Sequence, residues 1–428
     1  MLLALLALAQ SAVSSPYPTD AGDGFGLRVL SAGDVDADGT DDLIVQQAYD
    51  HERETIHVVS GARGNALRSF RAESESHHWI PLGPLGDTAP DGAPTFALLE
   101  IERDGWDELG CELRVLSARD GRELRSCAFA DLEGWDAPGL WVKRVPDVDD
   151  DGVEDLLAMG FQKADRARRL LRLWTLSGRT FDVLRRVEVS GIDGPNRNWS
   201  VAGDLDDDGA VEVAVRLTDE WGYQRGLQMI SGSTGQPLEA GGQTWGRRLK
   251  DFLVWDLVQV DDVDGDGVHE LVALHIDVHA CDHPRIACLV AGSSGAILAM
   301  RRTGLMKGDG AKLRVLHDWN GDGVRDVLAL DDRFAGFHAP RGHARVLSGR
   351  DLTALCTIEQ QTDPMLHDHF GLDACAIGDV DGDDVPDLAI SANMKPWNVL
   401  GRGAVEIRSG RDGTCLRVLT LDGIGAPR

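Results

Sequence analysis

The stretch "GDVDADGTDDLIV", residues 33–45, decides the fold. It places Asp34, Asp36, Asp38 and Asp42 within nine residues and then continues as an apolar, strand-like run. Carboxylates this close repel one another unless a positive charge compensates them. A single Asp-Gly turn is a common feature of proteins. Whether this stretch says anything about the fold therefore depends on how often the pattern recurs.

The acidic pattern recurs along the whole chain. Its lead residues are separated by 53 to 61 residues, and they are Asp34, Asp87, Asp147, Asp204, Asp262, Asp318 and Asp379. Seven copies at so regular a spacing indicate a repeat protein.

A second motif keeps the same phase, 26 to 30 residues after each lead aspartate. It reads "SGARG" in the first copy and "SGRDG" in the last, and its first residues are Ser60, Ser117, Ser177, Ser231, Ala291, Ser348 and Ser409. Gly and Ser between two apolar runs predict a tight hairpin; we call this motif the SG turn. Each repeat then reads as strand, acidic loop, strand, variable loop, strand, SG turn and strand.

Seven repeats of four antiparallel strands predict an all-β fold, a seven-bladed β-propeller with calcium loops between strands 1 and 2 of the blades. We expect one propeller domain over residues 16–428. Its blades are expected at about 20–72, 73–130, 131–190, 191–240, 241–303, 304–360 and 361–420. The first and last repeats each hold four strands in order, so the ring is expected to close by face packing, with help from the tail after Leu419.

The acidic loops have the donor pattern of a calcium site. Calcium takes six to eight oxygens, often from carboxylates at alternating positions of a tight loop. Counting from the lead aspartate, positions 1, 3, 5 and 9 offer side chains, position 7 offers its carbonyl, and Gly at position 6 permits the sharp turn. The six expected ligand sets are Asp34, Asp36, Asp38, Thr40 and Asp42; Asp147, Asp149, Asp151, Val153 and Asp155; Asp204, Asp206, Asp208, Ala210 and Glu212; Asp262, Asp264, Asp266, Val268 and Glu270; Asp318, Asn320, Asp322, Val324 and Asp326; and Asp379, Asp381, Asp383, Val385 and Asp387.

The loops are neither EF-hands nor equal to one another. An EF-hand needs a bidentate Glu at position 12, where these loops have apolar residues such as Val45. In repeat two, Ala89 and Thr95 replace carboxylates, so we predict about six calcium ions and an empty second loop. Asn320 in repeat six and Asp384, which replaces the glycine of repeat seven, predict weaker binding there.

Charge narrows the possible partners, and the N-terminus indicates an exported protein. The net charge of −28 argues against nucleic acid or an anionic membrane surface as a partner. The apolar run in residues 1–15 is too short to span a membrane and is typical of a signal peptide, although it has no basic residue. The cysteines leave two alternatives open: local disulfides (Cys111 with Cys127, Cys281 with Cys288), or buried thiols.

The chain resembles the FG-GAP/VCBS repeats of integrin α-subunit-like seven-bladed propellers. The most specific segments are "FGLRVLSAGDVDADGTDDLIV" (residues 25–45) and "FGLDACAIGDVDGDDVPDLAI" (residues 370–390), in which Phe-Gly precedes the lead aspartate by nine residues. The other five repeats lack that pair. The resemblance implies a secreted or cell-surface protein for adhesion or ligand recognition, with calcium in a structural role.

The face opposite the acidic loops is the expected ligand surface. Its connections carry aromatic residues among charged ones, which suits a protein or carbohydrate ligand: Trp106, Phe161, Trp221, Tyr223, Phe337 and Trp397. Trp79, Trp135, Trp141, Trp199 and Trp245 precede first strands, where they serve either this surface or the packing between blades. The alternative function is a secreted enzyme of the polysaccharide lyase or hydrolase type on this face, for which no catalytic residues are assigned. Two His-rich stretches, residues 275–283 and 367–370, leave a transition-metal site or acid–base chemistry open.

Overall fold

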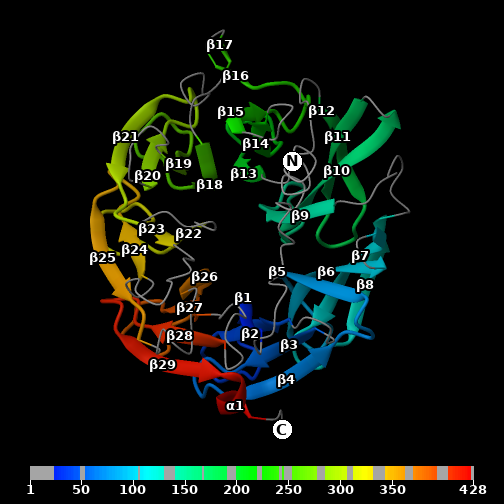
Figure 1. The fold of residues 1–428 in the computed structure, drawn as a ribbon, viewed down its shortest axis with the longest axis vertical. Helices are drawn as coiled ribbons and strands as arrows, with labels where there is room; N and C mark the ends of the chain where they lie inside the picture. The colour runs from blue at the N-terminus through cyan, green and yellow to red at the C-terminus, as the bar shows by residue number, and fades with distance from the viewer. Residues whose placement is uncertain are drawn as a thin grey trace, which may run out of the picture.

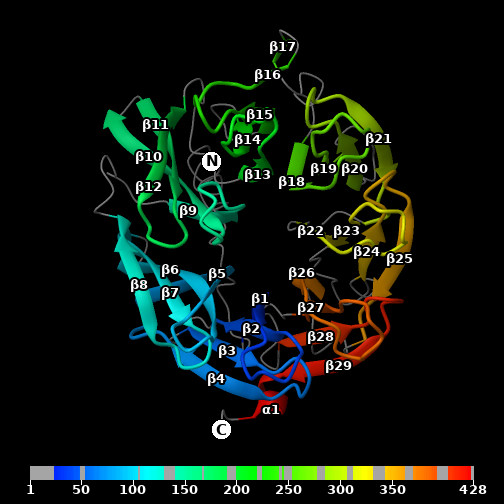
Figure 2. The same ribbon diagram turned by 180° about the vertical axis from the view of Figure 1, so that it is seen from behind.

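The computed structural model is a ring of seven antiparallel sheets around a central axis (Figure 1). It describes residues 24–48, 54–104, 107–129, 140–165, 168–189, 199–218, 224–240, 243–244, 253–276, 285–305, 312–330, 343–361, 370–392 and 403–425. In each blade the first strand lies nearest the axis and the last lies on the outer rim, as both faces of the ring show (Figures 1 and 2). The all-β, seven-bladed propeller predicted from the repeats is confirmed.

The strands follow one another in chain order within each blade. Blade one contains β1 (Phe25–Gly33), β2 (Asp42–Gln47), β3 (Thr55–Val59) and β4 (Ala66–Arg71). Blade two contains β5 (His77–Thr88), β6 (Pro94–Asp104), β7 (Asp107–Ser117) and β8 (Glu123–Ala128). Blade three contains β9 (Leu140–Val145), β10 (Asp155–Asp165), β11 (Arg168–Leu176) and β12 (Val183–Val189). Blade four contains β13 (Trp199–Gly203), β14 (Glu212–Thr218) and β15 (Gln224–Ile230).

The remaining three blades have four strands each. Blade five contains β18 (Leu253–Gln259), β19 (Leu271–Ile276), β20 (Arg285–Val290) and β21 (Ile297–Arg302). Blade six contains β22 (Lys312–Val315), β23 (Val327–Leu330), β24 (His343–Leu347) and β25 (Ala354–Glu359). Blade seven contains β26 (Phe370–Ala376), β27 (Leu388–Ala392), β28 (Ala404–Arg408) and β29 (Cys415–Thr420).

Blade four differs from the four-stranded expectation. Its outer segment forms an isolated bridge between Ile230 and Pro237 and one hydrogen bond from the Leu238 amide to the Met229 carbonyl. Proline has no amide hydrogen to donate to a ladder, which explains why a full outer strand does not form here. The chain continues through a short hairpin of β16 (Glu239–Ala240) and β17 (Gln243–Thr244).

The described core residues form seven clusters, each between two neighbouring blades. One cluster joins Phe96 and Leu98 of blade two to Ile44 and Ile56 of blade one, and the others repeat this arrangement around the ring. The second and third strands are buried on both faces, as in β27, where every residue is buried. Each blade therefore depends on its two neighbours to cover its apolar faces.

The ring closes by face packing between blades seven and one. Phe25 and Val45 of blade one share a cluster with Val405 of blade seven, and Ile424 of helix α1 (Leu421–Ile424) completes it. The guanidinium of Arg417 donates to the carbonyls of Gly61 (3.0 Å) and Ala62 (2.8 Å). No sheet mixes strands from the two ends of the described chain, so the expected closure without strand exchange is confirmed.

Candidate metal loops

The six acidic loops share one backbone conformation. Positions 4 and 6 are both left-handed in every copy, with φ of 60° at Ala37 and 91° at Gly39 in blade one. This double twist curls the chain around the lead aspartate, which accepts the position 6 amide in every copy. In blade one the lead Asp34 accepts the amides of Asp38 (3.0 Å) and Gly39 (2.9 Å). In blade seven, Asp384 adopts the same left-handed conformation (φ 65°) at the position that the other five loops give to glycine.

The position 5 carboxylate fixes the second half of the loop. Its Oδ1 accepts the amide of position 7 in all six copies, at 3.1 Å for Asp38 and Thr40 and at 2.9 Å for Asp151 and Val153. The residues that the sequence pointed to at position 7 thus close the loop through their amides.

The carboxylates that the sequence pointed to converge in five of the loops. One oxygen from each member lies within 4.8 Å of the others in these groups: Asp34, Asp36 and Asp42; Asp147, Asp149 and Asp155; Asp204, Asp206 and Asp208; Asp262, Asp264, Asp266 and Glu270; and Asp379, Asp381 and Asp387. Two oxygens bound to one calcium at 2.3–2.6 Å are at most about 5 Å apart. The groups therefore have the spacing of a calcium coordination shell. The loop of blade six, with Asn320 at position 3, forms no such acidic group among the described residues.

Some carboxylate oxygens in the loops are buried without a hydrogen-bond partner among the described residues. Oδ1 of Asp36 and Oε1 of Glu270 are two such atoms, and Glu270 is fully buried. A buried carboxylate oxygen without a donor or a cation is costly. These atoms fit a hard cation such as calcium, which binds oxygen.

Position 9 has a second role that the sequence did not reveal. In blade seven, Asp387 Oδ2 accepts the Val380 amide and Oδ1 accepts the Gly410 amide of the SG turn, both at 2.8 Å. The same pair of bonds joins Asp42, Asp155, Glu212 and Asp326 to their own loops and SG turns. These carboxylates link the two hairpin ends of a blade and therefore place the acidic loop and the SG turn on one face of the ring.

The glycine of the SG turn is explained by this contact. A Cβ at Gly410 would lie 1.8 Å from the Pro386 carbonyl oxygen at loop position 8, and at Gly61 it would lie 2.1 Å from that of Asp41. Only glycine permits so close an approach. Blade two has Ala118 in place of this glycine, and it is also the blade whose acidic loop is degenerate.

The loop of blade two is a short turn. The Ala89 amide donates to the Ala93 carbonyl (2.8 Å), and Asp91 Oδ1 accepts the Ala93 amide (3.2 Å). Thr95 occupies position 9 and is buried. That this loop binds no ion stays a prediction.

Burial alters the acidity of the position 9 carboxylates. Desolvation raises the pKa of Asp42 to about 6 and that of Glu212 to about 8, against the backbone amides that lower both values. Desolvation also raises the pKa of Asp155, Glu270, Asp326 and Asp387. A bound cation would favour the ionised forms and oppose these shifts.

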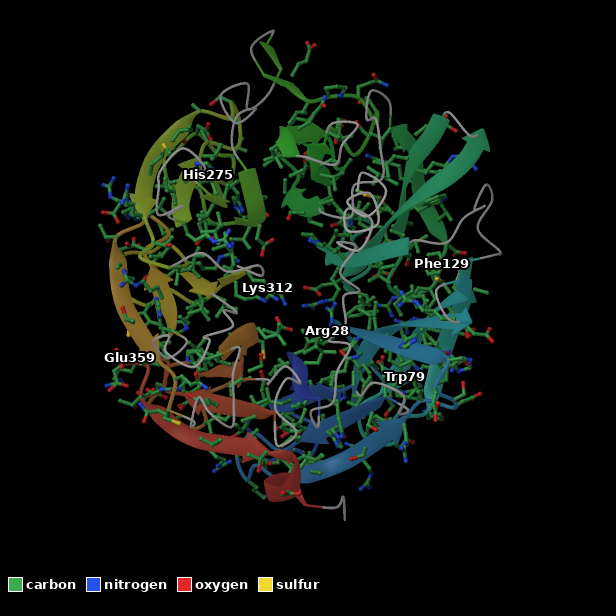
Figure 3. The ribbon with its side chains drawn as sticks, viewed as in Figure 1. Arg28, Trp79, Phe129, His275, Lys312 and Glu359 are labelled. Carbon is green, nitrogen blue, oxygen red and sulfur yellow. The ribbon has the colours of Figure 1, made fainter. Side chains whose placement is uncertain are left out.

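The inner wall of the ring carries polar contacts between blades. Lys312 and Arg28 both lie on this wall (Figure 3). Lys312 Nζ donates to the Leu372 carbonyl of blade seven (2.6 Å), and Arg314 forms an ion pair with Asp373. These contacts join blades six and seven.

Two of the tryptophans that the sequence placed before first strands lie within strands and pack between blades. Trp79 of β5 is buried in the cluster between blades one and two (Figure 3), and its Nε1 donates to Glu100 (2.8 Å). Trp199 is buried between blades three and four. For these two residues the packing interpretation is confirmed.

The described residues do not include the side chains of nine other aromatic residues that the sequence assigned to the ligand surface or to first strands. These residues are Trp106, Trp135, Trp141, Phe161, Trp221, Tyr223, Trp245, Phe337 and Trp397. Also outside the described residues are 1–23, 277–284 and 362–369. His275 is described and is buried on β19.

No disulfide joins Cys111 to Cys127 in the described chain, so that alternative is wrong. In the antiparallel pairing of β7 with β8, Cys127 lies opposite Leu113 instead of Cys111. Burial raises the pKa of the Cys288 thiol to about 12, which makes it unreactive.

Comparisons with known proteins define the fold only. No protein-family model matches the chain, and no curated protein sequence matches it. Among solved structures, Sqt1 of Saccharomyces cerevisiae aligns with a TM-score of 0.50 at 9% identity, covering 95% of this chain and 87% of Sqt1. Chaetomium thermophilum Sqt1, solved bound to the N-terminus of ribosomal protein L10, gives 0.48 at 11% identity over 93% and 87% of the two chains. The Dos1 propeller gives 0.46 at 9% identity over 93% and 84%.

Proposed function

We propose that this chain is a calcium-binding β-propeller, secreted or displayed at the cell surface, that acts as an adhesion or ligand-recognition module. Calcium has a structural role in it, and the ligand is an extracellular protein or carbohydrate. The observation that carries the proposal is the convergence of carboxylate oxygens within 4.8 Å in five loops, together with buried oxygens that lack hydrogen-bond partners.

Calcium acts here by removing a defined electrostatic cost. Each loop holds carboxylates that repel one another and that burial disfavours in the ionised form, as the raised pKa of Asp206, caused by burial, Asp208 and Asp204, illustrates. A divalent cation offsets both effects and holds the loop in its curled conformation. Extracellular modules bind calcium with dissociation constants of about 0.1–1 mM, a range that only calcium outside cells reaches.

The long hairpins of blades two and three support a ligand surface on the opposite face. Strands β6, β7 and β10 have 11 residues each, and β10 pairs with β11 as far as Asp165, five residues beyond its last pairing with β9 at Gly160. The end of the β6–β7 hairpin at which Asp104 pairs with Asp107 is the end away from the acidic loop. Within the described residues no helix is long and apolar enough to span a membrane.

The first test is thermal unfolding of the full chain in millimolar calcium and in excess chelator, with magnesium as the control ion. We expect a large loss of melting temperature in chelator that calcium restores and magnesium does not. An unchanged melting temperature would refute the structural role of calcium.

The recognition role needs its own measurement. Binding of the calcium-loaded protein to arrays of glycans and extracellular proteins should give saturable signals that are lost when the hairpin connections of blades two and three are shortened. Turnover of a glycan without saturable binding would instead favour the enzyme alternative.

A further inference from the structure

The six loops differ in the residue that the SG turn presents to loop position 5. In blade seven, Arg411 Nε lies 2.7 Å from Asp383 Oδ2, and its NH2 group donates to the Asp383 carbonyl (2.8 Å). Arg179 contacts Asp151 and Arg350 contacts Asp322 in the same way, and Arg63 of blade one pairs with both Asp36 and Asp38.

Blades four and five have serine at the turn position that arginine occupies in blades three, six and seven; in blade one, Arg63 follows one residue later in the turn. Ser293 donates a hydrogen bond to Asp266 Oδ2 at 2.5 Å, and its hydroxyl group brings no positive charge to the loop. Ser233 occupies this place in blade four, where it contacts Ser231. Among the described residues, no ion pair reaches the carboxylates of these two loops.

The position 5 carboxylate lies differently in the blades with arginine and in the blades with serine. In blades one, three and seven, the converging oxygens come from positions 1, 3 and 9, and the position 5 carboxylate, which pairs with arginine, is not among them. In blades four and five, Asp208 and Asp266 do join the converging group. Within the part of the chain that the structure describes, only blade five brings together all four carboxylates. One of them is the fully buried Glu270, whose Oε1 has no hydrogen-bond partner there.

We propose that the SG-turn residue sorts the acidic loops into two calcium classes. Blades four and five, with serine, are the high-affinity loops, and blades one, three, six and seven carry an arginine that acts as a resident counter-ion and weakens calcium binding. This inference rests on the proposed calcium role of the loops. Its physical basis is that a fixed positive charge within a few ångströms repels the incoming cation and withdraws one of its oxygen ligands.

The test is calorimetric titration of calcium into the full chain after chelator treatment. We expect two tight sites followed by weaker ones. Ser293→Arg should weaken one tight site at least tenfold, and Arg179→Ser in blade three, whose loop keeps Gly152 at position 6, should convert one weak site into a tight one, while Arg179→Lys should keep it weak.

Arg119→Ser in blade two is the matched control. Arg119 pairs with Asp91 (3.3 Å) as the other turn arginines do, but its loop has Ala89 and Thr95 in place of the carboxylates at positions 3 and 9, so the titration should not change. Six equal sites, or two tight sites that survive Ser293→Arg, would overturn this inference and leave the proposed function intact. No binding at millimolar calcium would overturn both.

Discussion

The position 9 carboxylate of blade seven offers the sharpest test of what holds a blade together. Asp387 is fully buried and accepts two backbone amides at 2.8 Å, from Val380 in its own loop and from Gly410 in the SG turn. If it were only a calcium ligand, removing its charge would cost nothing once calcium is absent, because burial already raises its pKa and disfavours the ionised form. If it is also a hydrogen-bonded link, the cost persists without calcium.

The structure sets the size of the effect. A hydrogen bond to a charged group contributes about 1.5–3 kcal/mol, and a buried donor left without a partner costs about 1–3 kcal/mol. Asp387→Ala leaves the buried Gly410 amide and the partly buried Val380 amide without acceptors, so we expect a loss of about 3 kcal/mol in the free energy of unfolding. Asp387→Asn keeps one acceptor oxygen, so we expect a loss of about 2 kcal/mol.

The assay is denaturant unfolding of wild type and variants in excess chelator and in saturating calcium. Asp381→Asn is the matched control, because Asp381 belongs to the same converging group but is exposed. It should cost stability in calcium and none in chelator. If Asp387→Asn is as stable as wild type in chelator, the reasoning about the link between loop and SG turn is refuted.

Three further predictions concern other parts of the ring. Asp384→Gly should raise the free energy of unfolding by about 1 kcal/mol, because glycine adopts the left-handed conformation without strain; denaturant unfolding that shows no gain contradicts this. Burial lowers the pKa of His57 from 6.5 to about 4, so the stability that neutral His57 provides is present above pH 6.5 and is lost as the pH falls through about 4, a loss of about 3 kcal/mol. In chelator, the stability difference between wild type and His57→Gln should therefore shrink as the pH falls over that range. A difference that stays constant rules the effect out. Ile424→Ala should lower the free energy of unfolding by about 2–4 kcal/mol, because Ile424 is 2% exposed in the cluster that closes the ring. The control is Val418→Ala on the outer rim, which should change it by less than about 0.5 kcal/mol. Equal effects of the two substitutions would argue against closure by packing.

The loop chemistry could be predicted from sequence because it is local. The alternating carboxylates of residues 34–42, and the glycine two places after Ala37, fix a curled turn through contacts within six residues. The regular return of this pattern in phase with the SG turn fixes the number of blades, since each four-stranded unit must cover its faces with neighbours of the same kind.

Contacts across a blade could not be predicted in the same way. Position 9 and the SG-turn glycine lie 19 to 23 residues apart, with a connection of variable length between them, and they meet only because the hairpins fold back in register. The spacing between the motifs was visible in the sequence, but a hydrogen bond between them was not.

The sequence by itself determined the seven-bladed propeller, the six acidic loops and the closure of the ring without strand exchange. Only the tertiary structure decided that position 9 joins two turns, that a glycine is needed where the turns touch, and that arginine or serine faces position 5. The physical reason is distance along the chain: backbone turns form from neighbouring residues, whereas the charge that a loop experiences comes from whichever side chain the folded blade brings beside it.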